Sequence, residues 1–424
     1  MRPPPVDGLY DRIANFGALI DAARGAVRGK RRNPGAAAFM ANLETEVLAL
    51  ERGLKDRAYR PGRYTAFEVR DPKPRMVSAA PFRDRVVHHA LYNVVAPLFE
   101  RGFIDHSYAN RVGKGTHAAI DRYEALRHRF GHVLRCDIYR YFPAMDHAIL
   151  KLGLRRRIAC DGALWLLDTI VDASNPQEPV HLHYPGDDLL TPLTRRRGLP
   201  IGNLTSQFFA NVYLDPLDHF CQERLGCRGY VRYVDDFALF HDDAVVLAEW
   251  RDAIAAFLAR RRLSLHPRKT FVAANALPAT FLGMVFCPDG RRRLPEDNVR
   301  RFRGHLRSFQ DRYTSGAAEF DEFSARIRSW SAHAAHADTW RLREAIFRDA
   351  VFRRKRKPAG PPAVSSAAAP GSTIRGTRAR PNATGTTPET GTTMPASVWP
   401  ARTHARAAGF TDPTGEFGSV QGPS

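Results

Sequence analysis

The sequence contains no uninterrupted apolar run that approaches the ~18 residues of a membrane-spanning helix. Its first five residues, Met-Arg-Pro-Pro-Pro, are followed by Asp7 and Asp11, so the apolar segment of a secretory signal peptide is missing. The five cysteines include no Cys-x-x-Cys pair, which disfavours a zinc ribbon, and their odd number favours free thiols in a reducing compartment. We therefore expect a cytoplasmic protein without a membrane partner.

Acidic residues are scarce relative to basic ones. The 424 residues include 44 Asp and Glu against 64 Lys and Arg, a net charge of +20. A hydrophobic content of 44% and a charged content of 25% are ordinary for globular proteins and exclude a wholly disordered chain. The excess charge indicates either a basic surface without a partner or a surface that binds a polyanion such as nucleic acid. Charge alone does not choose between these two interpretations.

Large apolar residues become rare from about Pro358 onward, where Pro, Gly, Ala, Ser and Thr dominate. Such a segment cannot bury enough apolar surface to offset its ordering entropy, so we predict a basic, disordered tail over residues 353–424. This tail holds ten Lys and Arg and three Asp and Glu, so +7 of the net charge belongs to it and +13 to residues 1–352. The body of the protein is therefore basic even without its tail.

The body mixes helical and strand-like patterns, which predicts an α+β fold. Apolar residues at helical spacing predict helices within 10–55, at 84–103, at 250–260 and within 296–352. Short apolar runs predict strands at 133–138, 230–234, 237–240 and 281–286, the last as one strand before a glycine turn.

Two adjacent acids, Asp235 and Asp236, stand between the apolar strands 230–234 and 237–240. This pattern predicts a hairpin whose tip carries two carboxylates, and Asp137 ends another apolar strand. Like charges beside a core are unfavourable unless a cation offsets them, and Mg²⁺ prefers oxygen ligands. Two such ions suit in-line phosphoryl transfer. The alternative for Asp137 is a plain cap or turn residue.

The order of these and other motifs resembles that of the reverse transcriptases, the palm-and-fingers polymerases that copy RNA into DNA. The similarity spans roughly residues 10–350. It implies an N-terminal helical segment at 1–55, a right-hand polymerase with fingers and palm at 56–290, and a short helical thumb at 291–352. The matching segments are 79–91, 113–117, 137–142 (Asp-Ile-Tyr-Arg-Tyr-Phe), 198–207 and 233–236 (Tyr-Val-Asp-Asp).

Segment 198–207, Gly-Leu-Pro-Ile-Gly-Asn-Leu-Thr-Ser-Gln, departs from the usual family pattern. Most reverse transcriptases have Gln-Gly near its centre and Ser-Pro at its end, whereas this chain has Ile201 before Gly202 and Gln207 after Ser206. The departure is similar to diversity-generating retroelement reverse transcriptases. We expect Gly202 to let the backbone approach the nascent base pair. We expect Gln207 to offer hydrogen-bonding groups to the substrate there, and we expect Ile201 to remove a polar template contact and so to loosen base selection.

The resemblance implies roles for individual residues near the metals and the sugar. Asp137, Asp235 and Asp236 would hold two Mg²⁺ ions, with Mn²⁺ as a substitute, and the Ile138 carbonyl would assist. Phe142, five residues after Asp137, occupies the steric-gate position, where a bulky ring favours dNTP over NTP. Its alternative is an ordinary core phenylalanine.

Further positions match the family's contacts to the triphosphate and the primer. Lys73 and Arg75 would bind the incoming triphosphate, or lie in a solvated turn. Lys269 would protonate the departing pyrophosphate, or be one surface cation among 64 Lys and Arg. The segment 281–283, Phe281-Leu282-Gly283, resembles the primer grip, with a plain core strand as its alternative.

The partners implied by the resemblance are a template RNA, a DNA primer and its cDNA product, dNTPs, and a basic accessory protein oligomer. No HNH-like Cys/His cluster follows residue 290, and no RNase H-like acidic tetrad is evident, so we expect cDNA synthesis without target nicking or template degradation. Basic residues at 291–293 and 300–303 would face the duplex from the thumb, or form a solvated face.

Three other functions stay open at this point. A retron, group II intron-like or defence-associated reverse transcriptase is disfavoured by Gln207 where Ser-Pro is usual. A nucleic-acid-binding protein with an inactive polymerase fold is disfavoured by the intact Asp137, Asp235 and Asp236. An untemplated palm enzyme such as a nucleotidyl cyclase is disfavoured by the extent of the match.

Overall fold

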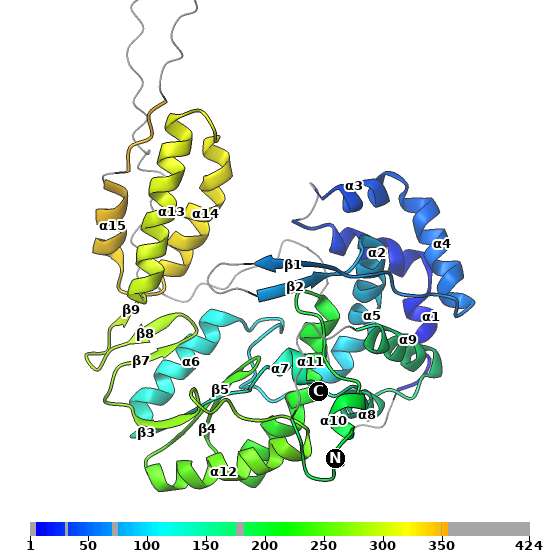
Figure 1. Ribbon diagram of the computed structural model, residues 1–424, viewed down its shortest axis with the longest axis horizontal. Coiled ribbons are helices and arrows are strands. Elements are labelled where there is room, and N and C mark those ends of the chain that lie inside the picture. The colour runs from blue at the N-terminus through cyan, green and yellow to red at the C-terminus, as the bar shows by residue number, and fades with distance from the viewer. Residues whose placement is uncertain (1–5, 30–32, 70–74, 175–181, 349, 355–424) are drawn as a thin grey trace, which may run out of the picture. The chain divides into compact units, whose positions relative to one another are not determined.

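The computed structural model describes residues 6–29, 33–69, 75–174, 182–348 and 350–354 (Figure 1). The chain divides into two compact units. Residues 1–295 with 336–338 make up the first, and residues 296–335 with the chain from 339 onward make up the second.

Helices dominate the N-terminal part of the first unit, and side-chain caps set where two of them begin. The Asn15 side chain accepts a hydrogen bond from the Ala18 N–H, and Asn33 accepts one from the Ala36 N–H. Pro34 takes the first helical position, where its missing N–H costs nothing. The elements are α1 (Tyr10–Ile13), α2 (Phe16–Ala26), α3 (Pro34–Ala41), α4 (Leu43–Lys55), the antiparallel hairpin β1 (Thr65–Val69) and β2 (Arg75–Ala79), and α5 (Phe82–Glu100).

The middle of the first unit is built around a four-stranded antiparallel sheet with strand order β4-β5-β3-β6. Strands β4 and β5 are consecutive and form the hairpin predicted from their apolar runs. The elements of this part are α6 (Thr116–Arg129), β3 (His132–Asp137), α7 (Tyr141–Ala144), α8 (His147–Arg155), α9 (Asp161–Asp172), α10 (Thr191–Thr194), α11 (Leu204–His219), the π-helical turn η1 (Phe220–Arg224), β4 (Gly229–Tyr233), β5 (Asp236–His241), α12 (Ala244–Arg260) and β6 (Phe271–Ala274).

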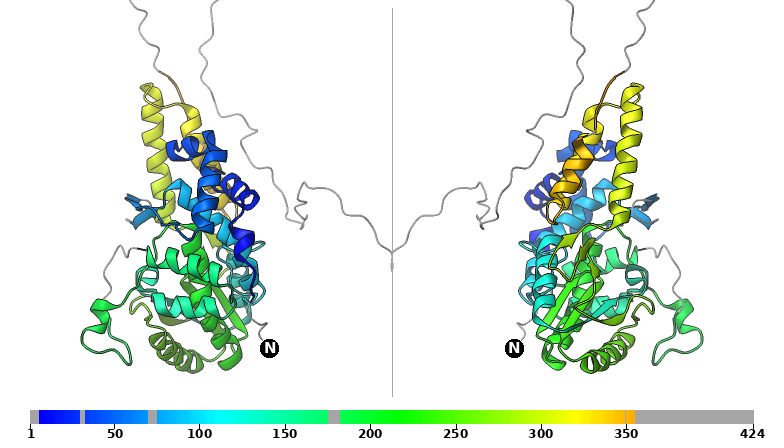
Figure 2. Two further views of the ribbon diagram at one scale, coloured as in Figure 1. Left: turned by 90° about the vertical axis from the view of Figure 1, so that its right-hand side faces the viewer. Right: turned by 90° about the vertical axis from the view of Figure 1, so that its left-hand side faces the viewer.

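The two faces of this sheet differ because side chains alternate along a strand. Leu134 and Cys136 of β3 join the main core together with Leu247 and Leu258 of α12, which packs on β3, β5 and β6 (Figures 1 and 2). The residues between them therefore face the other side, and they include Arg135. One face of β3 thus belongs to the main core, while the other carries the buried Val133 and the polar Arg135 and Asp137.

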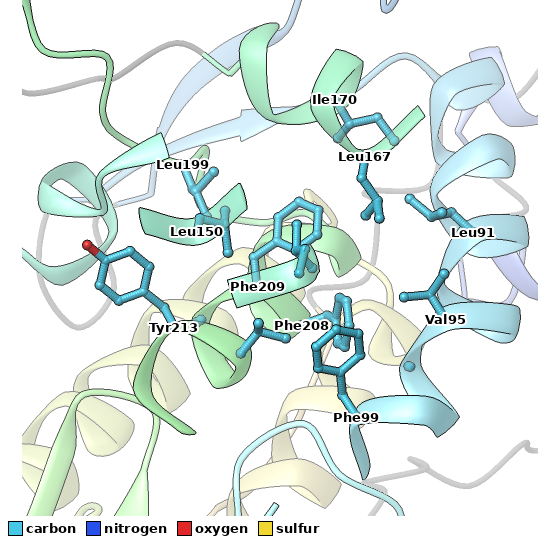
Figure 3. Packing of buried hydrophobic residues seen from close by; sticks show 14 of the residues in the cluster. Leu91, Val95, Phe99, Leu150, Leu167, Ile170, Leu199, Phe208, Phe209 and Tyr213 are labelled. Atoms are coloured by element: carbon cyan, nitrogen blue, oxygen red, sulfur yellow. The ribbon is translucent and has the colours of Figure 1, made fainter. Parts of the chain in front are cut away.

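Helix α11 runs through the main core and joins the N-terminal helices to the sheet (Figure 3). Its Phe208 makes an edge-to-face contact with Phe99 of α5, with ring centroids 5.4 Å apart. Phe209 and Tyr213 lie on the same helix and are buried. Figure 3 shows these rings beside the aliphatic side chains Leu91, Val95, Leu150, Leu167, Ile170 and Leu199.

A small three-stranded sheet completes the first unit, and it corrects one prediction. Residues 281–286 were expected to form a single strand, but β7 (Ala279–Phe281) and β8 (Met284–Phe286) are two strands joined by the turn Leu282-Gly283. Strand β9 (Arg292–Arg293) pairs with β8. The apolar run hid the turn because its first residue, Leu282, is itself apolar while adopting a φ of +46°.

The second unit consists of α13 (Glu296–Thr314), α14 (Phe320–Ala334) and α15 (Trp340–Arg348), as the helical spacing predicts. A capping box between Glu319 and Glu322 begins α14. Stacked rings fill the interior: Phe302 lies 3.9 Å from Trp330, centroid to centroid, and Phe309 lies 4.6 Å from Phe323. These aromatic contacts give the unit a core of its own.

The α+β prediction with antiparallel strands is confirmed, and all five cysteines are free, as expected. Helix boundaries differ modestly: α12 begins at Ala244 rather than at residue 250 because the Asp243 side chain caps it by accepting from the Val245 N–H. Within the described ranges, no helix has the length and apolarity needed to cross a membrane. The predicted tail lies outside the described residues except for 353 and 354.

Replacing Phe209 by Ala should test the role of α11 in joining the core. Phe209 is 1% exposed, so the substitution leaves a cavity and should lower the free energy of unfolding by about 3–5 kcal/mol. Urea denaturation followed by circular dichroism measures this change. The surface substitution Val245→Ala, at a side chain that is 65% exposed, serves as the control and should change stability by less than ~0.5 kcal/mol.

Candidate active site

The tip of the β4–β5 hairpin carries Asp235 on a two-residue turn. Tyr233 and Asp236 pair as the last residues of the two strands, so Val234 and Asp235 form the turn between them. Val234 has a φ of +58°, which a β-branched residue rarely adopts. A positive φ at only the first of the two central positions is the pattern of a type II′ turn. The tight turn places Asp235 and Asp236 side by side at the sheet edge.

The neighbouring strand brings a third carboxylate to the same edge. Strand β3 pairs with β5 so that Asp137 lies directly opposite Asp236. Burial, together with the nearby Asp137 carboxylate, raises the pKa of Asp235 to about 6. Burial also raises the pKa of Asp236, and Arg135 partly offsets that effect. The register of β3 on β5 thus brings together the three predicted acids, and their environment disfavours three negative charges.

Two cations engage these carboxylates. The Lys269 Nζ donates to both carboxylate oxygens of Asp137, at 3.0 and 2.9 Å. Arg135 Nη2 lies 3.3 and 3.4 Å from the two oxygens of Asp236. The predicted Lys269 therefore lies in the site, where it balances charge on Asp137.

Arg135 is a site residue that the sequence predictions missed. Its Nη1 donates to the Thr280 carbonyl of β7, and its guanidinium lies 5.6 Å from the centre of the Phe281 ring. It thereby links Asp236 to the β7–β8 hairpin. The signal was present, because Arg135 stands two residues before Asp137 and strand alternation places both on one face.

An open cleft of about 600 Å³ contains the three acids. Phe142 and Ile201 both line it, so the structure places the predicted steric-gate and template-loop residues beside the carboxylates. His266 lines it too, and its backbone N–H donates to the Asp137 carbonyl at 2.7 Å. The complete lining is Met76, Asp137, Ile138, Tyr139, Arg140, Tyr141, Phe142, Pro143, Ile201, Asp235, Asp236, His266 and Lys269.

The loop before α11 is fastened to strand β2. The Asn203 carboxamide donates to the Ser78 carbonyl at 2.8 Å and accepts from the Ala80 N–H at 3.2 Å. Gly202 has a φ of +109°, and a Cβ there would lie 2.7 Å from a methyl group of Val77. Gly202 therefore makes a close approach, but to β2 within the protein. Gln207 lies in the first turn of α11, half-buried, and is not among the cleft-lining residues.

The predicted primer-grip segment forms the tip of the β7–β8 hairpin. Leu282 and Gly283 both have positive φ, +46° and +79°, as a type I′ turn requires. The Phe281 side chain is fully buried and stacks on Tyr123 at 4.2 Å between centroids. The ring of Phe281 therefore belongs to the core, and only the turn is available at the surface.

The two predicted triphosphate-binding cations are placed only in part. Lys73 lies outside the described residues, and Arg75 is described as the first backbone position of β2. Met76, the next residue of that strand, does line the cleft. Strand β2 therefore borders the site.

The donor atoms of the site suit a hard divalent cation. Its three converging acids supply carboxylate oxygens, the ligands that Mg²⁺ and Mn²⁺ prefer. As the side chains lie, the described part of the chain holds no group of three His, Cys, Asp or Glu side chains arranged to hold an ion. Lys269 and Arg135 engage two of the three carboxylates instead. Binding of a metal ion would thus require Lys269 and Arg135 to release the carboxylate oxygens of Asp137 and Asp236.

Paired strands that carry three acids into an open cleft define a nucleotidyltransferase-like palm. Residues 69–286, just over half of the chain, match the family described as "Reverse transcriptase (RNA-dependent DNA polymerase)". The chain belongs to this reverse transcriptase family, and it has the family's polymerase fold of mixed helices and antiparallel sheets.

Individual relatives are distant. Protein YkfC of Escherichia coli (strain K12) is 26% identical over 193 residues, which cover 44% of this chain. The match spans 48%, or about half, of that relative's length. Telomerase from Candida albicans, solved in complex with a TWJ fragment of telomeric RNA, has a TM-score of 0.38 at 10% identity, covering 62% of this chain and 52% of that one. Apo telomerase from Candida tropicalis, truncated from its C-terminal domain, has a TM-score of 0.39 at 12% identity, covering 57% and 59%.

The raised pKa of Asp235 predicts a stability gain on removing its charge. The Asp235 carboxyl holds its proton more tightly in the folded state than in the unfolded chain. Its ionisation above pH ~6 therefore lowers the free energy of unfolding, and this loss is recovered as protonation proceeds toward pH ~4. In EDTA at pH 7.5, Asp235→Asn should therefore raise the free energy of unfolding by about 1–2 kcal/mol. Urea denaturation at pH 7.5 and pH 4 measures the difference, which should vanish at the lower pH.

The control for this comparison is Asp252→Asn. Asp252 is an exposed carboxylate on α12 that pairs with its neighbour Arg251. Its removal should leave stability at pH 7.5 unchanged or slightly lower. An Asp235→Asn variant no more stable than wild type at pH 7.5 would contradict the electrostatic account of the site.

Proposed function

We propose that this protein is an RNA-directed DNA polymerase that copies a template RNA into cDNA. The observation that carries the proposal is the convergence of Asp137, Asp235 and Asp236 in one cleft, within a reverse transcriptase domain. The finer proposal is the error-prone enzyme of a diversity-generating retroelement, and the apolar-Gly-x-x-x-Ser-Gln pattern of residues 201–207 supports it.

The proposed chemistry assigns the acids to metal binding. Asp137, Asp235 and Asp236 would hold two Mg²⁺ ions, or Mn²⁺, with help from the Ile138 carbonyl. Bound there, such ions supply charge stabilisation for the attacking 3′-hydroxyl and the leaving pyrophosphate. Lys269, released from Asp137, has an ammonium group that can donate a proton to the pyrophosphate.

The remaining cleft residues would select and position the nucleotide. The Phe142 ring would exclude a ribose 2′-hydroxyl by contact. Ile201 would present an apolar surface to the template base instead of a hydrogen-bonding group. Arg75 and Lys73, at and before the start of β2, would bind the triphosphate.

Template RNA, primer and cDNA would bind basic surfaces of the protein. On α13, Arg300, Arg303 and Arg307 are exposed, while Phe302 and Leu306 face the interior of the second unit. We propose that this basic face contacts the nucleic-acid backbone. The Leu282-Gly283 turn would approach the primer strand. A basic accessory oligomer completes the proposed set of partners.

The activity is tested by dNTP incorporation on poly(rA)/oligo(dT) with Mg²⁺. Wild type should extend the primer, and Asp137→Ala and Asp235→Ala should each lower kcat by at least about 10³-fold, since each removes a proposed metal ligand. Asp252→Ala, a matched change at an exposed carboxylate on α12, should retain wild-type activity. No incorporation by folded wild-type protein would sink the enzyme proposal.

The retroelement assignment is tested at Ile201. Restoring a polar template contact with Ile201→Gln should reduce misincorporation opposite template adenines by about 3–10-fold, corresponding to ~1 kcal/mol of discrimination. Sequencing of cDNA from a defined RNA template measures the error spectrum at each base. Unchanged errors at adenine, with the activity of the variant intact, would contradict the assignment but not the polymerase activity.

A further inference from the structure

Beneath the Asp235 turn lies a fully buried ion pair. Arg232 of β4 and Asp218 of α11 are both 0% exposed. The pair is bidentate, with Arg232 Nε 2.6 Å from Asp218 Oδ1 and Nη2 2.6 Å from Oδ2. The Tyr230 hydroxyl donates to the same Oδ1 at 2.8 Å. Asp218 thereby fixes the orientation of the whole guanidinium group.

The third nitrogen of Arg232 reaches the turn that carries Asp235. Nη1 donates to the Val234 carbonyl at 3.0 Å and to Asn211 Oδ1 at 3.2 Å. The Val234 carbonyl belongs to the peptide bond that leads into Asp235. One rigid guanidinium thus connects the helix α11 to the backbone of the metal-binding turn.

Arg232 itself is fastened on its backbone side. Its N–H donates to the His106 carbonyl, and its carbonyl accepts from the Tyr108 N–H, both at 2.9 Å. Asn211, the second acceptor of Nη1, donates through its own amide to the Ala109 carbonyl at 2.8 Å. Arg232 of β4 is therefore fixed by the segment 106–109 and by α11, and its guanidinium in turn contacts the turn that carries Asp235.

The turn needs such an anchor for two reasons. Val234 adopts a φ of +58°, a conformation that a β-branched residue keeps only when its surroundings enforce it. The Asp235 carboxylate also shares one cleft with the carboxylates of Asp137 and Asp236, and like charges repel one another. A buried ion pair is on average no more stabilising than apolar packing of the same volume. The buried pair of Arg232 and Asp218 is therefore better explained by the need to position the Asp235 turn than by a gain in the stability of the fold.

We infer that Arg232, oriented by Asp218, is a positioning residue that fixes the Asp235 turn for metal binding through the Val234 carbonyl. The inference deepens the proposed polymerase function and rests on it. Lysine can pair with Asp218 but lacks the planar fork, so Arg232→Lys should keep the buried charge and release Val234.

The experiment measures Mn²⁺ binding and activity separately. The free Mn²⁺ signal in electron paramagnetic resonance gives the dissociation constant of the full-length protein for the metal alone, without substrate. Arg232→Lys should raise that constant about 10-fold or more and lower kcat at least about 10-fold, as indirect supports of metal ligands typically do. The KM for dTTP should stay within about threefold, because Arg232 lies outside the cleft lining.

Tyr230→Phe is the matched control. It removes the other hydrogen bond to Asp218 and leaves the Nη1 contact with Val234, so it should lower the urea midpoint while keeping Mn²⁺ affinity within about twofold. Adding Val234→Gly to Arg232→Lys should recover at least about threefold of the lost affinity, because glycine adopts positive φ without strain. A merely structural role of Arg232 predicts loss of stability with no such rescue.

The outcomes separate the two proposals. Wild type that neither binds Mn²⁺ nor incorporates dTTP would overturn the polymerase function. Wild type that does both, with a folded Arg232→Lys indistinguishable from it, would overturn only the positioning role. If Arg232→Lys does not fold, Asn211→Leu carries the test, since it keeps the ion pair but, unlike Tyr230→Phe, removes the second acceptor that holds Nη1 in line with the Val234 carbonyl. That variant should weaken Mn²⁺ binding about threefold, and unchanged binding would overturn the positioning role.

Discussion

Electrostatic repulsion among three aspartates is the constraint on which the site depends. The antiparallel register of β3 on β5 sets Asp137 opposite Asp236, and the hairpin turn adds Asp235 beside them. A one-residue slip of these strands would move Asp137 away from Asp236 only by turning the core residues outward. The cations Lys269 and Arg135 offset part of the negative charge that this enforced proximity concentrates. The excess of basic residues elsewhere makes the acidic cluster a local exception in a chain of net charge +20.

The fold around the site depends on apolar packing on one face of the sheet and on polar contacts of Arg135 and Asp137 on the other. Large aromatic rings on α11 hold the helices to one face of the sheet, where side chains are apolar. On the opposite face of β3, Val133 is buried, whereas Arg135 and Asp137 interact with charged or polar partners. The site therefore arises where the core ends: the same strand supplies Cys136 to the interior, Asp137 to the cleft lining and Arg135 to the carboxylate of Asp236.

Sequence patterns predicted the parts of this structure that depend on local periodicity. The β4–β5 hairpin, strand β3 and the helices of the second unit followed from apolar spacing, and Asp137, Asp235, Phe142 and Ile201 were brought into one cleft as motif order implied. What escaped prediction depends on tertiary contacts. Arg135 and Arg232 look like ordinary strand arginines until their partners Asp236 and Asp218, which belong to other elements, are placed beside them. The turn at Leu282 escaped because its conformation overrides the apolar character of its residues.

The attachment of the Asn203 loop to β2 has a mechanical consequence. Asn203 bonds both Ser78 and Ala80, and Gly202 leaves no space between the loop and Val77, so strand and loop form one block. Met76 lies on the strand side of that block and Ile201 on the loop side, and both border the cleft. A displacement of β2 would therefore move Ile201 with it. Strand β2 and the loop would move together as the cleft widened or narrowed. A ligand that contacts Met76 on the strand would therefore also contact Ile201 on the loop.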